Sequence, residues 1–426
     1  MAETPVGSLK RLLVTDYETS VFRRTLLLLA LIIPAFAANF LVLYISAHWL
    51  GAAEFGVFYA ANTISNILFS GSLILNLAFT RYLSGVLTAH GSSGLVAGTR
   101  KIQHTVLWWG GWTATGLALC GLIAGNQLGV RSAIVIVLIV LDAFTAYVGD
   151  VGRVLLQTAR RTLALGFYTL VWMILRLLLC IAGLLWFGTV WGALAGIVLS
   201  SLLMIAAVNF VLLRCPSGAN EPVGKLPTLT GELPALFGYG LLVTVSNLDI
   251  LVGYFALPSV SFGIYAASSI LPKAILTVLL PLQQMLFPHM LSGRSNKQAD
   301  QRFRRKAALV VIGLAVAGTL FTVLIEPLAC GEAPGILLCR PSLMNIILLG
   351  VAPLALVRVL LLEDIVNHRP FRAFLLLIPL VGFAVWTRRT AVSQEALMAW
   401  GYLGCCLVAV LLLVGHRLVP SLPRAN

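Results

Sequence analysis

The chain has 426 residues, of which 59% are hydrophobic and only 10% are charged, whereas ordinary soluble domains contain about 25% charged residues. Too few polar residues remain to cover the surface of a soluble protein of this length, so the chain must face lipid. The formal net charge of +14 does not indicate nucleic-acid binding, because the basic residues are scattered between apolar runs and form no binding face.

Apolar segments of membrane-spanning length follow one another along the whole chain. A spanning helix needs about 20 mostly apolar residues. We predict twelve of them, at 25–47, 57–79, 105–125, 132–156, 163–187, 190–213, 236–258, 262–286, 307–329, 342–362, 372–387 and 396–415. The predicted fold class is therefore an all-α polytopic membrane protein.

The interruptions between these segments suggest two halves. The longest are 80–104, 214–235 and 287–306, and the middle one contains four prolines among polar residues, a composition typical of a linker. We predict an N-terminal six-helix half at 1–215, a cytoplasmic linker at 216–235 and a C-terminal six-helix half at 236–426.

The distribution of basic residues predicts the orientation. With the N-terminus inside, the inner segments hold 22 Lys and Arg residues, and the outer segments hold only Arg131, Arg340, Arg388 and Arg389. Cytoplasmic loops retain basic residues, so we expect both termini in the cytoplasm.

A short motif occurs twice. Phe55-Gly56-Val57-Phe58-Tyr59-Ala60-Ala61 resembles Phe262-Gly263-Ile264-Tyr265-Ala266-Ala267-Ser268 at an offset of 207 residues, close to half the chain. Each copy begins the second helix of a six-helix half, which indicates a parallel repeat. Transporters with two such halves commonly bind substrate at the interface between them.

The same region carries a resemblance to a known family. Leu50-Gly51-Ala52-Ala53-Glu54-Phe55-Gly56, followed by Tyr59, Ala60 and Arg81, resembles the opening of polysaccharide-transport proteins of the MOP exporter superfamily. Asp249, then Phe262-Gly263-Ile264-Tyr265 and Ala267, is similar to a pattern in the second half of that family.

This resemblance implies a V-shaped bundle of two six-helix halves around a central cavity. It also implies a function, the flipping of lipid-linked oligosaccharides or the export of related envelope glycans across the bacterial inner membrane by alternating access. Lipid II flippases of the superfamily usually carry two further helices, which argues against a peptidoglycan precursor. The expected partners are a lipid-linked glycan, membrane lipids, a polysaccharide polymerase and glycosyltransferases, and no nucleic acid.

Four ionisable residues lie near the centres of predicted spans: Asp142, Arg176, Asp249 and Lys273. A charge there costs about 2.5–3.5 kcal/mol even on the lenient insertion scale, so each needs a partner or a wet cavity. One interpretation is a polar cavity that holds a sugar-phosphate head group. The other is internal ion pairing, such as Lys273 with Asp249, together with snorkelling of Arg358 towards the inner surface.

A polar stripe supports the cavity. Lys273 shares a helix face with Ser269 and Thr277, and the repeat offset places Asn62 opposite Ser269 and Asn66 opposite Lys273. The alternative is that such residues only hydrogen-bond packed helices together. The candidate substrate-binding residues are Lys273, Asp249, Arg176, Asn66, Asn62, Ser269, Thr277, Asn39 and Asp142.

Other chemistry finds little support. The seven cysteines show no metal-ligand spacing, although Cys330 and Cys339 beside a predicted outer loop are a candidate disulfide. There is no GxSxG or Walker sequence, so we expect neither an enzyme nor a cofactor. Two alternatives remain open: a multidrug or cation antiporter of the same superfamily, and an integral-membrane glycan transferase.

We expect Asp150 and Arg153 to form a structural pair near the inner surface.

Overall fold

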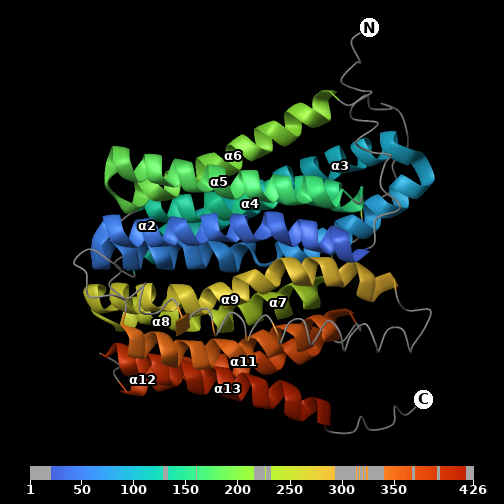
Figure 1. Ribbon diagram of the computed structural model, residues 1–426. Helices are drawn as coiled ribbons and strands as arrows, with labels where there is room; N and C mark the ends of the chain where they lie inside the picture. Colours follow the sequence, from blue (N-terminus) through green and yellow to red (C-terminus); the bar gives the residue numbers. More distant parts are fainter. Residues whose placement is uncertain are drawn as a thin grey trace. The chain divides into compact units, whose positions relative to one another are not determined.

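The computed structural model of the chain describes residues 21–127, 133–159, 161–214, 232–292, 340–366, 370–390 and 394–418, with a few isolated residues between them. Every regular element in these ranges is helical (Figure 1). Six helical stretches in them are long and apolar enough to cross a membrane, or seven if the bent pair α7–α8 is one span. The prediction of an all-α polytopic membrane protein is therefore confirmed.

The helices match most of the predicted spans, but the second one, 57–79, is interrupted by a turn at Ser70 and Gly71. They are α2 Val21–Phe69, α3 Ser72–Gln127, α4 Ala133–Thr158, α5 Thr162–Phe187, α6 Val190–Arg214, α7 Leu233–Ser246, α8 Leu248–Ala256, α9 Ser259–Ser292, α11 Pro341–Val366, the 3-10 segment η3 Pro370–Leu376, α12 Leu377–Thr390 and α13 Glu395–Leu418. The predicted ninth span, 307–329, and the pair Cys330 and Cys339 lie outside the described residues.

Two of these helices are too long for one crossing. α2 has 49 residues and α3 has 56, against about 20 for the hydrocarbon core of a bilayer. Each is divided by a glycine with a positive φ, Gly51 at 70° and Gly91 at 66°, a conformation that other residues adopt only at a cost. Gly51 lies between the first two predicted spans, as expected.

The break at Gly91 corrects a prediction. Residues 80–104 were expected to be a loop, but they are helical on both sides of Gly91. The segment contains no proline, so the helix can continue until a single glycine changes its direction.

The described residues form two compact units. Unit 1 combines Met1–Val42 with Ser72–Glu232, and unit 2 combines Leu43–Gly71 with Leu233–Asn426. The second segment of α2 therefore packs with the C-terminal helices, and the return to unit 1 falls at the break between α2 and α3. The predicted division of the sequence into two six-helix halves, joined by a linker at 216–235, stays a prediction.

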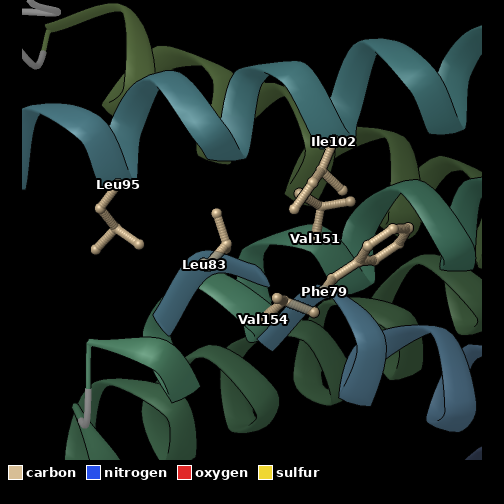
Figure 2. Close-up of a cluster of buried hydrophobic side chains, with 6 residues drawn as sticks. All are labelled: Phe79, Leu83, Leu95, Ile102, Val151 and Val154. Carbon is tan, nitrogen blue, oxygen red and sulfur yellow. The ribbon is translucent and has the colours of Figure 1, made fainter. Parts of the chain in front are cut away.

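The core of unit 1 includes a cluster where α3 folds back against α4 (Figure 2). Phe79, Leu83, Leu95, Ile102, Val151 and Val154 are buried together. Both arms of α3 contribute, and a Cβ on Gly98 would lie only 2.9 Å from Leu83 Cδ2. Arg100 then donates a hydrogen bond to Leu212 O at 2.6 Å. This bond satisfies a carbonyl in the last turn of α6 that has no helical partner.

Glycines also set the packing of α5 against α6. A Cβ on Gly196 would overlap the carbonyl of Leu179, and one on Gly183 would overlap the carbonyl of Gly192. The two backbones are therefore in direct contact, as is common where helices associate within a membrane.

In unit 2 the two copies of the repeated motif touch one another. A Cβ on Gly56 would lie 2.8 Å from Phe262 Cδ1, and one on Gly263 would overlap the carbonyl of Ala52. The second segment of α2 and the start of α9 thus meet at equivalent glycines. The glycine in each motif is required by this close approach.

Candidate functional site

The seventh predicted span is broken near its middle. α7 ends at Ser246, α8 begins at Leu248, and their axes differ by 53°. Such a break leaves carbonyls of the first helix without helical partners. Two side chains compensate, because Asn247 Nδ2 donates to Val243 O at 2.9 Å and Tyr402 OH donates to Ser246 O at 2.8 Å. Discontinuous helices of this kind hold the ion and substrate sites of many transporters.

Asp249 lies in the first turn of α8, directly after the break. The N-terminal end of a helix carries a partial positive charge, which favours a carboxylate there. The Asp249 side chain is completely buried. Lys273 Nζ of α9 donates to its Oδ1 at 2.6 Å, and Tyr265 OH of the same helix donates to its Oδ2 at 2.9 Å. Both carboxylate oxygens are therefore held from α9.

Lys273 is buried too, and its ammonium also faces an aromatic ring. Nζ lies 5.2 Å from the ring centroid of Tyr402 on α13, within the range of a cation–π interaction. The hydrogen bond from Tyr402 OH to Ser246 O fixes the orientation of that ring. We call Asp249, Lys273, Tyr265 and Tyr402 the Asp249 cage.

Further polar side chains surround the cage within unit 2. Tyr59, from the second segment of α2, lies close to Ser269, which is one turn of α9 away from Lys273. The thiol of Cys406 lies close to Tyr402 on the same helix. Segments far apart in the sequence thus converge on one buried ion pair, and such networks are stable only when their members are satisfied.

Unit 1 contains the other mid-span pair. Arg176 Nη2 of α5 lies 3.6 Å from Asp142 Oδ2 of α4, and both side chains are buried. The four ionisable residues singled out in the sequence thus form two ion pairs, each within one compact unit. The structure shows the predicted ion pairing of Lys273 with Asp249. A role of these residues in binding substrate stays a prediction.

A third polar cluster joins α3, α4, α5 and α6. Asp150 accepts hydrogen bonds from Arg153 at 3.0 Å and from Asn76 at 2.8 Å. The Arg153 guanidinium lies 4.7 Å from the ring centroid of Trp172, and Trp172 Nε1 donates to Ser201 Oγ at 3.3 Å. The predicted pairing of Asp150 with Arg153 is confirmed, and these contacts tie together helices of unit 1.

The members of the predicted polar stripe differ in burial. Ser269 and Lys273 are buried, whereas Asn62 is half-buried and Asn66 is exposed. Asn39 of unit 1 is also half-buried. The side chain of Thr277 lies outside the part of the chain that the structure describes. The central cavity stays a prediction.

Arg358 does not snorkel as expected. Only 5% of the residue is exposed, and its guanidinium donates to the carbonyl of Leu276 on α9. The donor reaches a neighbouring backbone carbonyl within unit 2, so it does not need the inner surface to satisfy a hydrogen bond.

Sequence reasoning missed the aromatic part of the cage. Tyr265 was noted only as part of the motif, and Tyr402 lies in the last predicted span, far along the chain from Asp249. The polar residues Ser246 and Asn247 just before Asp249, inside an apolar run, were the available signal for the helix break.

No protein-family profile matches the chain, and no curated protein matches it. Solved structures do match. An outward-facing multidrug resistance MATE family transporter of the MOP superfamily is 14% identical, with a TM-score of 0.65 over 96% of each chain. An inward-facing one is 15% identical, with a TM-score of 0.57 over 88% of this chain and 94% of that one. A MOP superfamily transporter from Pyrococcus furiosus is 16% identical, with a TM-score of 0.60 over 96% of each chain.

These neighbours are transporters and not enzymes, so they lend no support to a glycan transferase. The fold expected from the motifs is confirmed, and two of these neighbours are MATE transporters, so the polysaccharide-transport family in particular gains no support from them. The chain has the fold of the MATE transporters of the MOP superfamily.

Proposed function

We propose that this chain is an alternating-access transporter that exports a small organic substrate in exchange for a cation, as a multidrug or cation antiporter does. The observation that carries the proposal is its likeness to MATE transporters in both outward- and inward-facing conformations, along most of the chain. A fold that supports both conformations in its neighbours provides the rigid units that alternating access requires.

The Asp249 cage supports the coupling part of the proposal. Buried ionisable residues inside a membrane are costly and mark ion or proton pathways. Asp249 and Lys273 lie beside a discontinuous helix, where ions and charged substrates are commonly bound. Without a nucleotide-binding sequence in the chain, an ion gradient is the natural source of energy.

A second candidate is the transport of a lipid-linked oligosaccharide or a related envelope glycan across the bacterial inner membrane. The resemblance of Leu50–Gly56 and Phe262–Tyr265 to polysaccharide-transport proteins favours it, and Lys273 is a cation suited to a diphosphate. The Pyrococcus furiosus protein is described as having a binding pocket of reverse polarity that suggests a different function. Members of one fold therefore need not share a substrate.

Reconstituted transport separates the two candidates. Purified protein in proteoliposomes, under an imposed proton or sodium gradient, is offered ethidium as a cationic probe or a fluorescent lipid diphosphate oligosaccharide. The proposal expects gradient-driven movement of ethidium that is lost in Asp249→Asn. Movement of the lipid diphosphate without movement of ethidium would replace it with the glycan flippase. Arg388→Gln, at an exposed position of α12, is the matched control for a change of charge.

A further inference from the structure

The Asp249 cage has the chemistry of a binding site for a monovalent ammonium. It offers one carboxylate oxygen at 2.6 Å and an aromatic face at 5.2 Å from the same nitrogen. A carboxylate with an aromatic ring recognises ammonium ions in general, whether they belong to a side chain or to a ligand. In the described conformation the occupant is the side chain of Lys273.

The cage is positioned by elements that do not depend on Lys273. Tyr265 OH holds Asp249 Oδ2 at 2.9 Å, and Tyr402 is anchored to Ser246 O at the helix break. Asp249 itself is fixed by the first turn of α8. The site would therefore keep its shape if another cation replaced the ammonium of Lys273.

We infer that the Asp249 cage binds an exported organic ammonium, and that Lys273 is a tethered competitor for the same carboxylate. The inference rests on the proposed function and adds to it the residue that carries the coupling proton. That residue is Lys273, while Asp249 receives each cation in turn.

Charge balance dictates the coupling. A single buried carboxylate cannot neutralise two cations, and an ammonium left in an apolar site without its counter-ion is strongly disfavoured. When the organic cation binds Asp249, the Lys273 ammonium therefore gives up one proton to water and becomes a neutral amine. On the other side of the membrane a proton adds to that amine, the ammonium returns to Asp249, and the organic cation leaves. One proton enters for each cation exported, and no covalent bond is made to the substrate.

The groups around Lys273 are compatible with this exchange. Asp249 on α8 is its acidic partner, Tyr402 and Cys406 approach on α13, Tyr265 lies on α9 itself, and Tyr59 approaches on α2 through Ser269. On α11, the Arg358 guanidinium is bound to the Leu276 carbonyl, about one turn away. The phenols and the thiol are neutral near pH 7, so the ionised pair Asp249 and Lys273 sets the charge of the cage.

The first test is chemical rescue of the purified protein. Lys273→Ala removes the tethered ammonium, and ethylammonium chloride is added while the melting temperature is measured. We expect a saturable rise in melting temperature for Lys273→Ala, little change for the wild type, and no rise for Lys273→Ala combined with Asp249→Asn at the same salt. A folded Lys273→Ala variant without this rise would overturn the inference. If Lys273→Ala does not fold, the shorter and neutral Lys273→Gln takes its place.

The second test uses the wild type with tetraethylammonium as the probe, in a weakly buffered detergent solution. Competition with a protonated lysine predicts release of about one proton per bound cation. It also predicts that the apparent Kd falls about tenfold for each unit by which the pH rises, as long as Lys273 is protonated. Binding without proton release would refute the exchange. The proposed function can fail separately. If ethidium is not transported but ethylammonium still stabilises Lys273→Ala, the ammonium site is supported and the antiporter function is refuted.

Discussion

The contact between Lys273 and Asp249 joins two ionised groups that are both buried in a helical membrane protein. Removing one partner of a buried pair leaves an uncompensated charge and costs about 3–5 kcal/mol, whereas removing both is often close to neutral. The stability and the transport activity of each variant of this pair should therefore be measured separately.

We predict that Lys273→Ala abolishes export and lowers the free energy of unfolding by about 3–5 kcal/mol. Lys273→Arg should retain part of the activity, because the charge persists although its geometry differs. The double variant Lys273→Ala and Asp249→Ala should recover stability in a denaturation assay but remain inactive in proteoliposomes. Recovery of transport by the double variant would show that the pair is only structural.

Two tyrosines of the cage provide a matched comparison. Tyr265→Phe removes a hydrogen bond to a charged carboxylate and should cost about 1.5–3 kcal/mol. Tyr402→Phe removes a bond to a neutral carbonyl but keeps the ring beside Lys273, and should cost about 0.5–1.5 kcal/mol. Chemical unfolding in detergent measures both values. Equal losses would indicate that the Asp249 carboxylate is not ionised in the folded state.

At the scale of the elements, glycines decide where helices meet. α5 and α6 touch through Gly183, Gly192 and Gly196, and the repeated motifs touch through Gly56 and Gly263. Inside a bilayer the apolar surfaces of helices gain little by leaving lipid, so close backbone packing carries much of the association. A methyl group at such a contact must push the helices apart.

We predict that Gly196→Ala lowers the melting temperature and the yield of folded protein, since its Cβ would overlap the Leu179 carbonyl, which belongs to the backbone and cannot rotate away. Gly116→Ala is the control, because its Cβ would meet nothing within 4 Å. That substitution should be neutral or stabilise α3 by up to about 1 kcal/mol. Equal behaviour of the two variants in a thermal unfolding assay would argue against the α5–α6 contact.

At the scale of the whole molecule, exposed tryptophans lie near the ends of the predicted spans. Trp108, Trp109 and Trp112 are exposed at the predicted inner end of the third span. Trp49, Trp186, Trp191 and Trp400 are exposed at the predicted outer ends of their spans. Tryptophan is enriched at both membrane–water interfaces, so these positions mark the two boundaries of the bilayer on their own helices.

Cysteine labelling tests this topology in a variant free of native thiols. Ser92→Cys should react only after the membrane is permeabilised, because Ser92 follows the Gly91 break on the predicted cytoplasmic side. Ala53→Cys, beside Gly51, should react from outside. Ser295 and Glu332, which lie outside the described residues, extend the test to later loops, inside and outside respectively. Labelling of Ser295→Cys in intact cells would overturn the assignment.

Composition and local pattern were enough to predict the class of molecule and most helix positions. Runs of apolar residues have no stable alternative to a helix in lipid, because every backbone polar group must be satisfied within the segment. The motif around Gly56 and Gly263 also predicted the fold. A close approach of two helix backbones requires glycine, and this requirement is visible in the sequence. The pairing of Asp150 with Arg153 was predictable because residues three apart on one helix lie on the same face.

Only the tertiary structure decided where separate helices meet. Nothing local to Asp249 indicates that Tyr402, in the last predicted span, anchors the helix break beside it, or that Lys273 lies 2.6 Å away. The loop predicted at 80–104 is helical because one glycine suffices to turn the chain. Arg358 finds a backbone carbonyl on α9 and not the inner surface. A sequence records which residues need a partner, whereas the partner itself is set by packing between segments that lie far apart along the chain.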